Sequence, residues 1–196
     1  MTNRAPEQIT VRPNRRLLLL LAVAASLSVL LGIHLLSSPA SPASGAAKDD
    51  GAVPPGVGVF DDRYPAVSKL DPELLAALRQ AATDAAADGV EFTVNSGWRS
   101  AAYQDHLLRE AVADYGSEAE AARWVATATT SAHVAGDAVD LGPRASTDWL
   151  AQRGAAYGLC QIYANEPWHY ELVPDAASSG CPQMYPDAAH DPRMHS

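Results

Sequence analysis

Cysteine and basic residues are both scarce in this sequence of 196 residues. Its two cysteines, Cys160 and Cys181, are too few for a cysteine-rich zinc cluster or a dense disulfide scaffold. The 14 Lys and Arg residues are outnumbered by 23 Asp and Glu residues, and the formal net charge is −9. Because no basic stripe is available to neutralise phosphates, we expect no nucleic acid among the partners. Aromatic residues make up only 7% of the chain, so the core must rely on aliphatic side chains and alanine.

Charge is missing altogether from residues 17–36, an apolar run that follows Arg4, Arg12, Arg15 and Arg16. About 20 apolar residues are enough for a helix to cross a bilayer, and the preceding arginines favour a cytoplasmic N-terminus. We therefore expect residues 1–16 to be a cytoplasmic basic segment and residues 17–36 to be a single-pass signal anchor in the cell membrane. Cleavage as a signal peptide, with secretion of the rest, is the alternative.

The chain after this apolar run divides into three parts. Residues 37–58 are rich in Ser, Pro, Ala and Gly and predict a flexible linker. Residues 59–185 form the expected folded domain, a monomer outside the cytoplasm, and residues 186–196 are expected to be a flexible tail. An oxidising compartment favours a disulfide between Cys160 and Cys181.

Capping and turn signals divide the expected domain into helices and strands. Asp71 followed by Pro72 predicts the start of a helix, and Gly89 predicts its end. Helices outnumber strands and the strands come late, which indicates an α+β fold with a small, mostly antiparallel sheet and flanking helices. The further helices are expected at 100–115, 117–127 and from Ser146 or Thr147 to 158, and the strands at 90–95, 138–141, 159–164 and 168–173.

Three short segments hold the residues that could bind a metal or take part in catalysis: SGWRS at 96–100, SAHVAGDAVD at 131–140 and EPWH at 166–169. His133, Asp140 and His169 supply two imidazoles and a carboxylate, a donor set that suits one Zn²⁺ ion with a coordination position left open. We expect His133 on a loop that turns at Gly136, Asp140 on the strand that follows, and His169 on a neighbouring strand. Asp137 is an alternative ligand that we rank below Asp140.

Glu166 and Arg99 add what a metal site needs to become an active site. Glu166 lies in the turn just before His169 and is not needed as a ligand, so it is a candidate general base. Arg99, at the mouth of a helix, is a candidate to bind a carboxylate or to stabilise an oxyanion. Each of these residues alone has an ordinary structural interpretation, as a surface ion pair or a turn carboxylate. A non-catalytic wall-binding domain with a structural zinc, or chance motifs in an adhesin, remain alternatives.

The three segments, in this order, resemble the VanY-type D-alanyl-D-alanine carboxypeptidases, zinc peptidases of the Hedgehog/D,D-peptidase fold. The resemblance implies zinc ligands at His133, Asp140 and His169 and a general base at Glu166. It also implies that Arg99, Gln104 and Ser131 contact the substrate. Position 137 departs from the family pattern, because an Asp stands where a small, hydroxyl or basic residue is common.

The function implied by this resemblance is removal of the terminal D-Ala from peptidoglycan stem peptides. The expected partner is therefore a stem peptide ending in D-Ala-D-Ala, and the expected location is the outer side of the membrane. A D,D- or L,D-dipeptidase or an endopeptidase of the cell wall on the same scaffold is the nearest alternative.

Overall fold

The computed structural model describes residues 48–195. The predicted basic segment 1–16, the predicted membrane segment 17–36 and the first part of the predicted linker lie outside the described residues. Among residues 48–195, no helix has both the length and the apolar character needed to cross a membrane.

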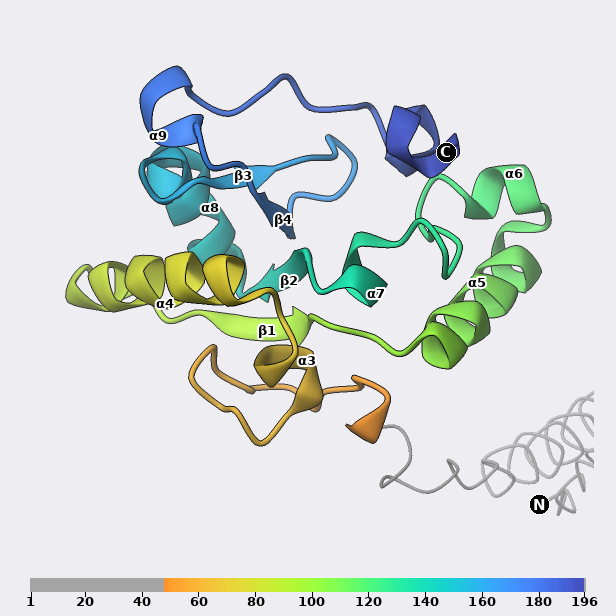
Figure 1. The fold of residues 1–196 in the computed structure, drawn as a ribbon, viewed down its shortest axis with the longest axis horizontal. Helices are drawn as coiled ribbons and strands as arrows, with labels where there is room; N and C mark the ends of the chain where they lie inside the picture. Colours follow the sequence, from red (N-terminus) through yellow and green to blue (C-terminus); the bar gives the residue numbers. More distant parts are fainter. Residues whose placement is uncertain (1–47, 196) are drawn as a thin grey trace, which may run out of the picture. The chain divides into compact units, whose positions relative to one another are not determined.

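The described residues form a four-stranded antiparallel sheet with helices and 3-10 turns around it, in the strand order β1-β2-β4-β3. This arrangement confirms the expected small antiparallel sheet with flanking helices. In Figure 1, α4 runs along the sheet. Helices α5 and α6 lie on the far side of α7 from α4. The elements are α3 Pro65–Ser68, α4 Pro72–Ala87, β1 Thr93–Ser96, α5 Ala101–Tyr115, α6 Glu118–Ala121, α7 Ala132–Ala135, β2 Ala138–Gly142, α8 Arg144–Arg153, η1 Gly154–Tyr157, β3 Leu159–Gln161, β4 His169–Leu172, α9 Ala176–Ser179, η2 Ala188–His190 and η3 Pro192–His195.

Capping residues fix the two long helices as the sequence predicts. The Asp71 side chain accepts hydrogen bonds from the backbone N–H groups of Glu73 and Leu74, so α4 begins at Pro72. The Ser100 hydroxyl accepts a hydrogen bond from the N–H of Tyr103 and starts α5 in the same way. Both starts lie at the predicted residues, because each capping signal is local in the sequence.

The sheet has an apolar face and a polar face, because successive side chains of a strand point in opposite directions. Val139 of β2 and its cross-strand partner Tyr170 of β4 belong to the main core, which also holds Leu74 and Leu78 of α4. Asp140 of β2, paired with His169 of β4, therefore points to the opposite face. Packing against α4 thus orients the strands so that the polar pair lies together on one side.

Several predicted boundaries differ from the structure. The helix predicted to start at Ser146 or Thr147 begins at Arg144, and those two hydroxyls instead donate to the carbonyl oxygens of Pro143 and Arg144 inside its first turn. Its last predicted turn is the separate 3-10 turn η1. The helix predicted over 117–127 is the single turn α6, and the first predicted strand starts only at Thr93.

Both predicted flexible segments contain residues that pack onto the domain. In residues 48–58, Val57 is buried in the main core and its carbonyl oxygen accepts a hydrogen bond from the N–H of Val94. At the other end, η2 and η3 occupy most of the expected tail, and the side chains of Asp187 and Asp191 are almost fully buried. The prediction of a flexible tail was therefore wrong for residues 187–195. Apolar patterning does not reveal such a segment, because ion pairs hold it.

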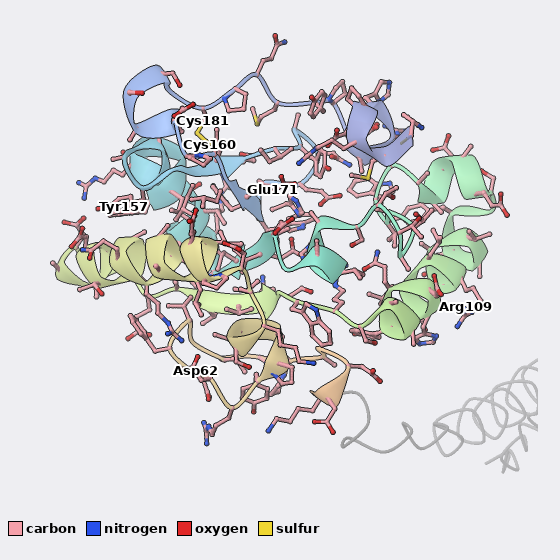
Figure 2. All side chains as sticks on the ribbon, viewed as in Figure 1. Asp62, Arg109, Tyr157, Cys160, Glu171 and Cys181 are labelled. Atoms are coloured by element: carbon pink, nitrogen blue, oxygen red, sulfur yellow. A yellow bond between two sulfur atoms is a disulfide. The ribbon has the colours of Figure 1, made fainter. Side chains whose placement is uncertain are left out.

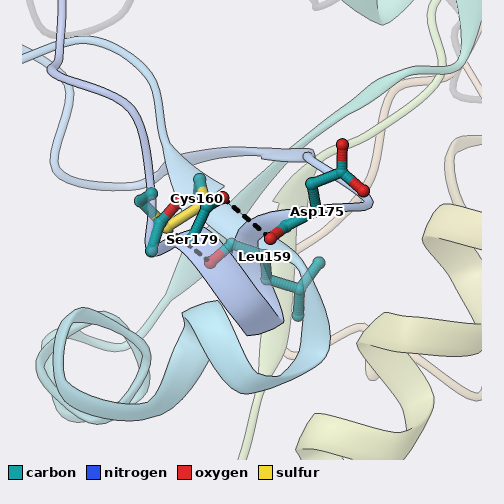
Figure 3. The surroundings of a disulfide bond; sticks show 6 residues. Leu159, Cys160, Asp175 and Ser179 are labelled. Atoms are coloured by element: carbon teal, nitrogen blue, oxygen red, sulfur yellow. Dashed lines mark hydrogen bonds between the residues drawn. A yellow bond between two sulfur atoms is a disulfide. The ribbon is translucent and has the colours of Figure 1, made fainter.

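The predicted disulfide between Cys160 and Cys181 is present, with a Cα–Cα distance of 5.5 Å. It joins β3 to the chain that follows α9, and Figure 3 shows the bond beside the hydrogen bond from the Ser179 hydroxyl to the Asp175 carbonyl. The bond thereby ties the edge strand of the sheet to the segment that leads into the C-terminal turns.

Candidate active site

His133 lies on the single-turn helix α7, and its side chain is held by a residue of the segment 96–100. Its Nδ1 donates a hydrogen bond to the carbonyl oxygen of Gly97 at 2.9 Å, which leaves Nε2 as the nitrogen facing Asp140. Gly136 ends the helix with φ 90° and lies so close to Lys69 that a Cβ would be 2.7 Å from its carbonyl oxygen. The expected loop is therefore a helical turn, but the turn at Gly136 is where the sequence predicts it.

Asp140 and His169 meet because they are directly opposite each other on neighbouring antiparallel strands. Oδ1 of Asp140 lies 3.2 Å from Nδ1 of His169 and 3.4 Å from Nε2 of His133. Ligand atoms of these three buried residues all lie within 4.8 Å of one another. The structure thus brings together the three predicted metal ligands from α7, β2 and β4.

The ionisation states of Asp140 and His133 are those that a metal ligand needs. Burial would raise the pKa of the Asp140 carboxyl, but the imidazoles of His133 and His169 hold it well below its usual range. Burial lowers the pKa of His133, and the Arg99 charge acts in the same direction, so this imidazole is neutral and able to bind a metal. An ionised carboxylate between two buried imidazole nitrogens fits the ligand preference of Zn²⁺. Asp137, the alternative ligand, is exposed and lies outside the cluster.

A second carboxylate holds the far side of His169. Nε2 of His169 donates to Oε1 of Glu171 at 3.3 Å, and burial opposes the positive charge on this imidazole. The hydrogen bonds to Asp140 and Glu171 nevertheless raise the pKa of His169 to about 9. Sequence reasoning missed Glu171, although its position two residues after His169 on a strand places both side chains on one face.

Glu166 lies beside the cluster in the turn between β3 and β4. Its Oε2 is 3.8 Å from Nδ1 of His169, and its carbonyl oxygen accepts a hydrogen bond from the His169 N–H at 3.1 Å. Burial raises the pKa of the Glu166 carboxyl to about 7 against the opposing charge of His169. A carboxyl with this pKa can both take up and release a proton near neutral pH.

The guanidinium of Arg99 is oriented by three neighbours. It donates to Ser96 Oγ at 2.8 Å, to Gln104 Oε1 at 3.1 Å and to Asp140 Oδ2 at 3.2 Å. The Gln104 amide in turn donates to the carbonyl oxygen of Ala126 at 2.9 Å. Both ends of the Gln104 amide are thus engaged within the protein, and this residue fixes the position of Arg99.

A groove of about 370 Å³ opens over the cluster. Arg99, Glu166 and the buried Ser131 line it next to the metal ligands, and it continues along α5 to Tyr115 and Trp124, whose rings stack at 5.9 Å. The groove thus joins the cluster to the aromatic pair on and beyond α5.

The segment that holds these residues is similar to a known family of proteins. Residues 67–175 match the family model of VanY, described as D-alanyl-D-alanine carboxypeptidase. A D-alanyl-D-alanine carboxypeptidase from Enterococcus faecalis is 35% identical over 114 aligned residues, and the match covers 45% of this chain and 42% of that protein. The chain therefore corresponds to less than half of that relative's length.

Solved structures with the same fold include two VanY proteins. One is a mutant of the vancomycin resistance D,D-pentapeptidase VanY from a VanB-type resistance cassette in complex with Zn(II), and the other is VanYB in complex with D-Ala-D-Ala. Each is 30% identical to this chain with a TM-score of 0.52, and the alignments cover 56% of this chain and 76% and 75% of the two VanY chains. The LD-carboxypeptidase LdcB is 24% identical, with a TM-score of 0.51 over 67% of this chain and 70% of LdcB, and shares the fold.

Proposed function

The chain belongs to the VanY family of D-alanyl-D-alanine carboxypeptidases, and on this premise we propose that it removes the terminal D-Ala from peptidoglycan stem peptides. The proposal rests above all on one observation. A buried carboxyl that is not part of the ligand cluster, that of Glu166, lies beside His133, Asp140 and His169 at the floor of an open groove. A purely structural zinc site has no use for such a group.

The residues of the groove support a hydrolytic mechanism. When bound by His133, Asp140 and His169, Zn²⁺ supplies Lewis acidity toward a carbonyl oxygen. Glu166, in its ionised form, removes a proton from the attacking water and then passes it to the amine of the leaving D-alanine. In the metal-free protein burial raises the pKa of Glu166, and a cation beside it would favour the ionised form that accepts the proton.

Arg99 would provide positive charge for the substrate. Its guanidinium is only partly exposed and is held by Ser96 and Gln104, so it enters the reaction already oriented. A fork of N–H donors suits either the terminal carboxylate of the peptide or the negative charge that develops on the scissile carbonyl oxygen. Ser131 and Gln104, which line the same groove, are the other two proposed substrate contacts, and Gln104 also holds Arg99 in place.

The test is incubation of the zinc-loaded protein with a stem pentapeptide ending in D-Ala-D-Ala, followed by mass analysis of the products. Release of free D-alanine supports the proposal. Release of the D-Ala-D-Ala dipeptide would instead establish cleavage of the L,D bond before it, hydrolysis of free D-Ala-D-Ala alone would establish a D,D-dipeptidase, and cleavage of cross-linked peptide alone would establish an endopeptidase. A tetrapeptide substrate serves as the matched control, because only an L,D-specific enzyme would shorten it. Zinc-dependent wall binding with no cleavage of any substrate would leave a binding domain.

We propose in addition that this domain works outside the cytoplasmic membrane, held there by residues 17–36. The Cys160–Cys181 disulfide agrees with an oxidising compartment. Fractionation of cells that express the full chain tests the location. Recovery in the membrane fraction with protease access from outside supports an anchored form, and recovery in the medium supports cleavage.

A further inference from the structure

The C-terminal turns cover the polar face of the sheet next to the metal cluster. The Asp191 carboxylate is fully buried and accepts a hydrogen bond from the hydroxyl of Tyr163 at 2.9 Å. The ring of Tyr163 packs against the ring of His169, with 5.0 Å between their centres. Residues 187–195 therefore contact a residue, Tyr163, that packs on a predicted metal ligand, although they come long after the segment 166–169.

Arg193 of η3 joins this segment to Glu171 of β4. Its Nη1 lies 2.6 Å from Oε2 of Glu171, and its Nη2 lies 3.2 Å from Oε1 of the same carboxylate. Its Nε donates to Oδ2 of Asp191 at 2.9 Å. The guanidinium therefore bridges two buried carboxylates, and its fork geometry fixes the plane of the Glu171 carboxylate.

Glu171 carries this orientation to the metal cluster. The oxygen that faces Arg193 Nη2, Oε1, also accepts the hydrogen bond from Nε2 of His169 at 3.3 Å. With its Nε2 proton directed at Glu171, the imidazole turns its other nitrogen, Nδ1, toward Asp140. Glu171 of β4, labelled in Figure 2, thus links Arg193 to Nε2 of His169, the ring nitrogen opposite the proposed ligand nitrogen Nδ1.

We infer that Arg193 is a positioning residue of the metal centre: through the Glu171 carboxylate it sets the ring orientation of His169, so that the C-terminal segment completes the zinc site. Carboxylates that hold a ligating histidine typically matter to metal affinity by about 10–100-fold. Here the Glu171 carboxylate is itself held by Arg193, which lies outside the three segments that carry the predicted site residues. The inference concerns metal binding alone and does not depend on the substrate or on the reaction proposed above.

A loss of zinc affinity in an Arg193 variant could also arise because Arg193 anchors residues 187–195 to the domain. The chain offers a matched control for this explanation. Nε of Arg123 lies 2.8 Å from Oδ2 of the buried Asp187, so this arginine anchors the same segment through an ion pair of the same kind. Within residues 48–195, the ion pairs of Arg123 are with Asp187 and Glu120 and not with Glu171 or the metal ligands. Its replacement should therefore loosen the segment without disturbing His169 directly.

The experiment compares Arg193→Met with Arg123→Met in the full chain. Zinc affinity is measured by competition with a chelator, coordination geometry by the absorption spectrum of the Co²⁺-loaded protein, and folding by the melting temperature. We expect Arg193→Met to weaken zinc binding about 10-fold or more and to change the Co²⁺ spectrum. We expect Arg123→Met to lower the melting temperature but to leave zinc affinity within about 2-fold and the Co²⁺ spectrum unchanged.

Two further variants keep the inference open to refutation. Glu171→Gln preserves the shape of the side chain, so it can be measured even if Arg193→Met fails to fold, and it should also weaken zinc binding about 10-fold. Because Arg193 acts through Glu171, adding Arg193→Met to Glu171→Gln should cause little further loss of affinity. Zinc affinity that is unchanged in Glu171→Gln, or that falls equally in Arg123→Met and Arg193→Met, would overturn the inference.

Discussion

Replacement of Glu166 by Gln should raise the free energy of unfolding of the metal-free protein. In the zinc-loaded protein the same replacement should abolish hydrolysis. The Glu166 side chain is buried beside His169, and its pKa rises from 4.5 to about 7 on folding, mainly through loss of solvent. Glutamine has nearly the same shape but cannot ionise. The variant therefore removes a charge that the folded state does not tolerate well.

The pKa shift sets the size and the pH dependence of this effect. Below pH 4.5 the carboxyl is protonated in both the folded and the unfolded states, so the Glu166 side chain carries no electrostatic cost. As the pH rises toward 7, the unfolded chain ionises first, and the folded state loses about 3 kcal/mol by pH 8. We expect the free energy of unfolding of Glu166→Gln to exceed that of the parent by an amount that grows by about 2–3 kcal/mol between pH 5 and pH 8.5.

Urea unfolding of both metal-free proteins across this pH range gives the difference directly, because all other titrating groups contribute to both. The same titrations with saturating Zn²⁺ are the control. A nearby cation stabilises the ionised carboxylate, so the advantage of the glutamine variant should shrink. A stability difference that stays constant with pH would refute the argument that burial sets the pKa of Glu166. Full hydrolytic activity of the variant would refute its role as the general base.

Three other perturbations test separate parts of the structure. His133→Ala removes one of the three metal ligands, so added Zn²⁺ should no longer raise the melting temperature in a thermal scan; an unchanged rise would contradict the ligand assignment. Replacing both Cys160 and Cys181 by Ser opens a loop with a sequence separation of 21 and should lower the free energy of unfolding by about 3 kcal/mol, as measured in urea; no loss would mean that the C-terminal segment holds β3 without the bond. Leu78→Ala empties a fully buried position between α4 and the sheet and should cost about 2–5 kcal/mol in the same assay, with zinc affinity unchanged; weaker zinc binding would show that core packing and metal site are coupled.

The sequence predicts the parts of this fold that depend on local signals. Asp71 and Ser100 cap their helices as expected, because a cap needs only a side chain and the N–H groups of the next turn. The association of His133, Asp140 and His169 was predicted from the types of the residues and from the family resemblance. The contact between Asp140 and His169 then follows from strand pairing, whereas His133 comes from the helical turn α7.

The features that the sequence did not predict rest on partners far along the chain. Arg193 and Asp191 lie in a polar stretch with no apolar period, and the former contacts Glu171, 22 residues away. Charged residues at this separation carry no pattern that distinguishes a buried ion pair from a solvated tail. In the same way, the Pro- and Gly-rich stretch before residue 59 looks like a linker, although Val57 packs in the core and bonds to Val94.

The direct pairing of Asp140 with His169 ties the chemistry to the alignment of two short strands. Sliding β4 by one residue against β2 would exchange the two faces of the strand, turning His169 toward α4 and bringing Tyr170 out beside Asp140. A register shift of β4 would therefore disrupt the apolar core on one face of the sheet and the metal ligands on the other. An insertion or deletion in the turn at residues 165–167 should accordingly abolish metal binding and fold stability together, whereas changes of length in loops away from β2 and β4 should leave the metal site intact.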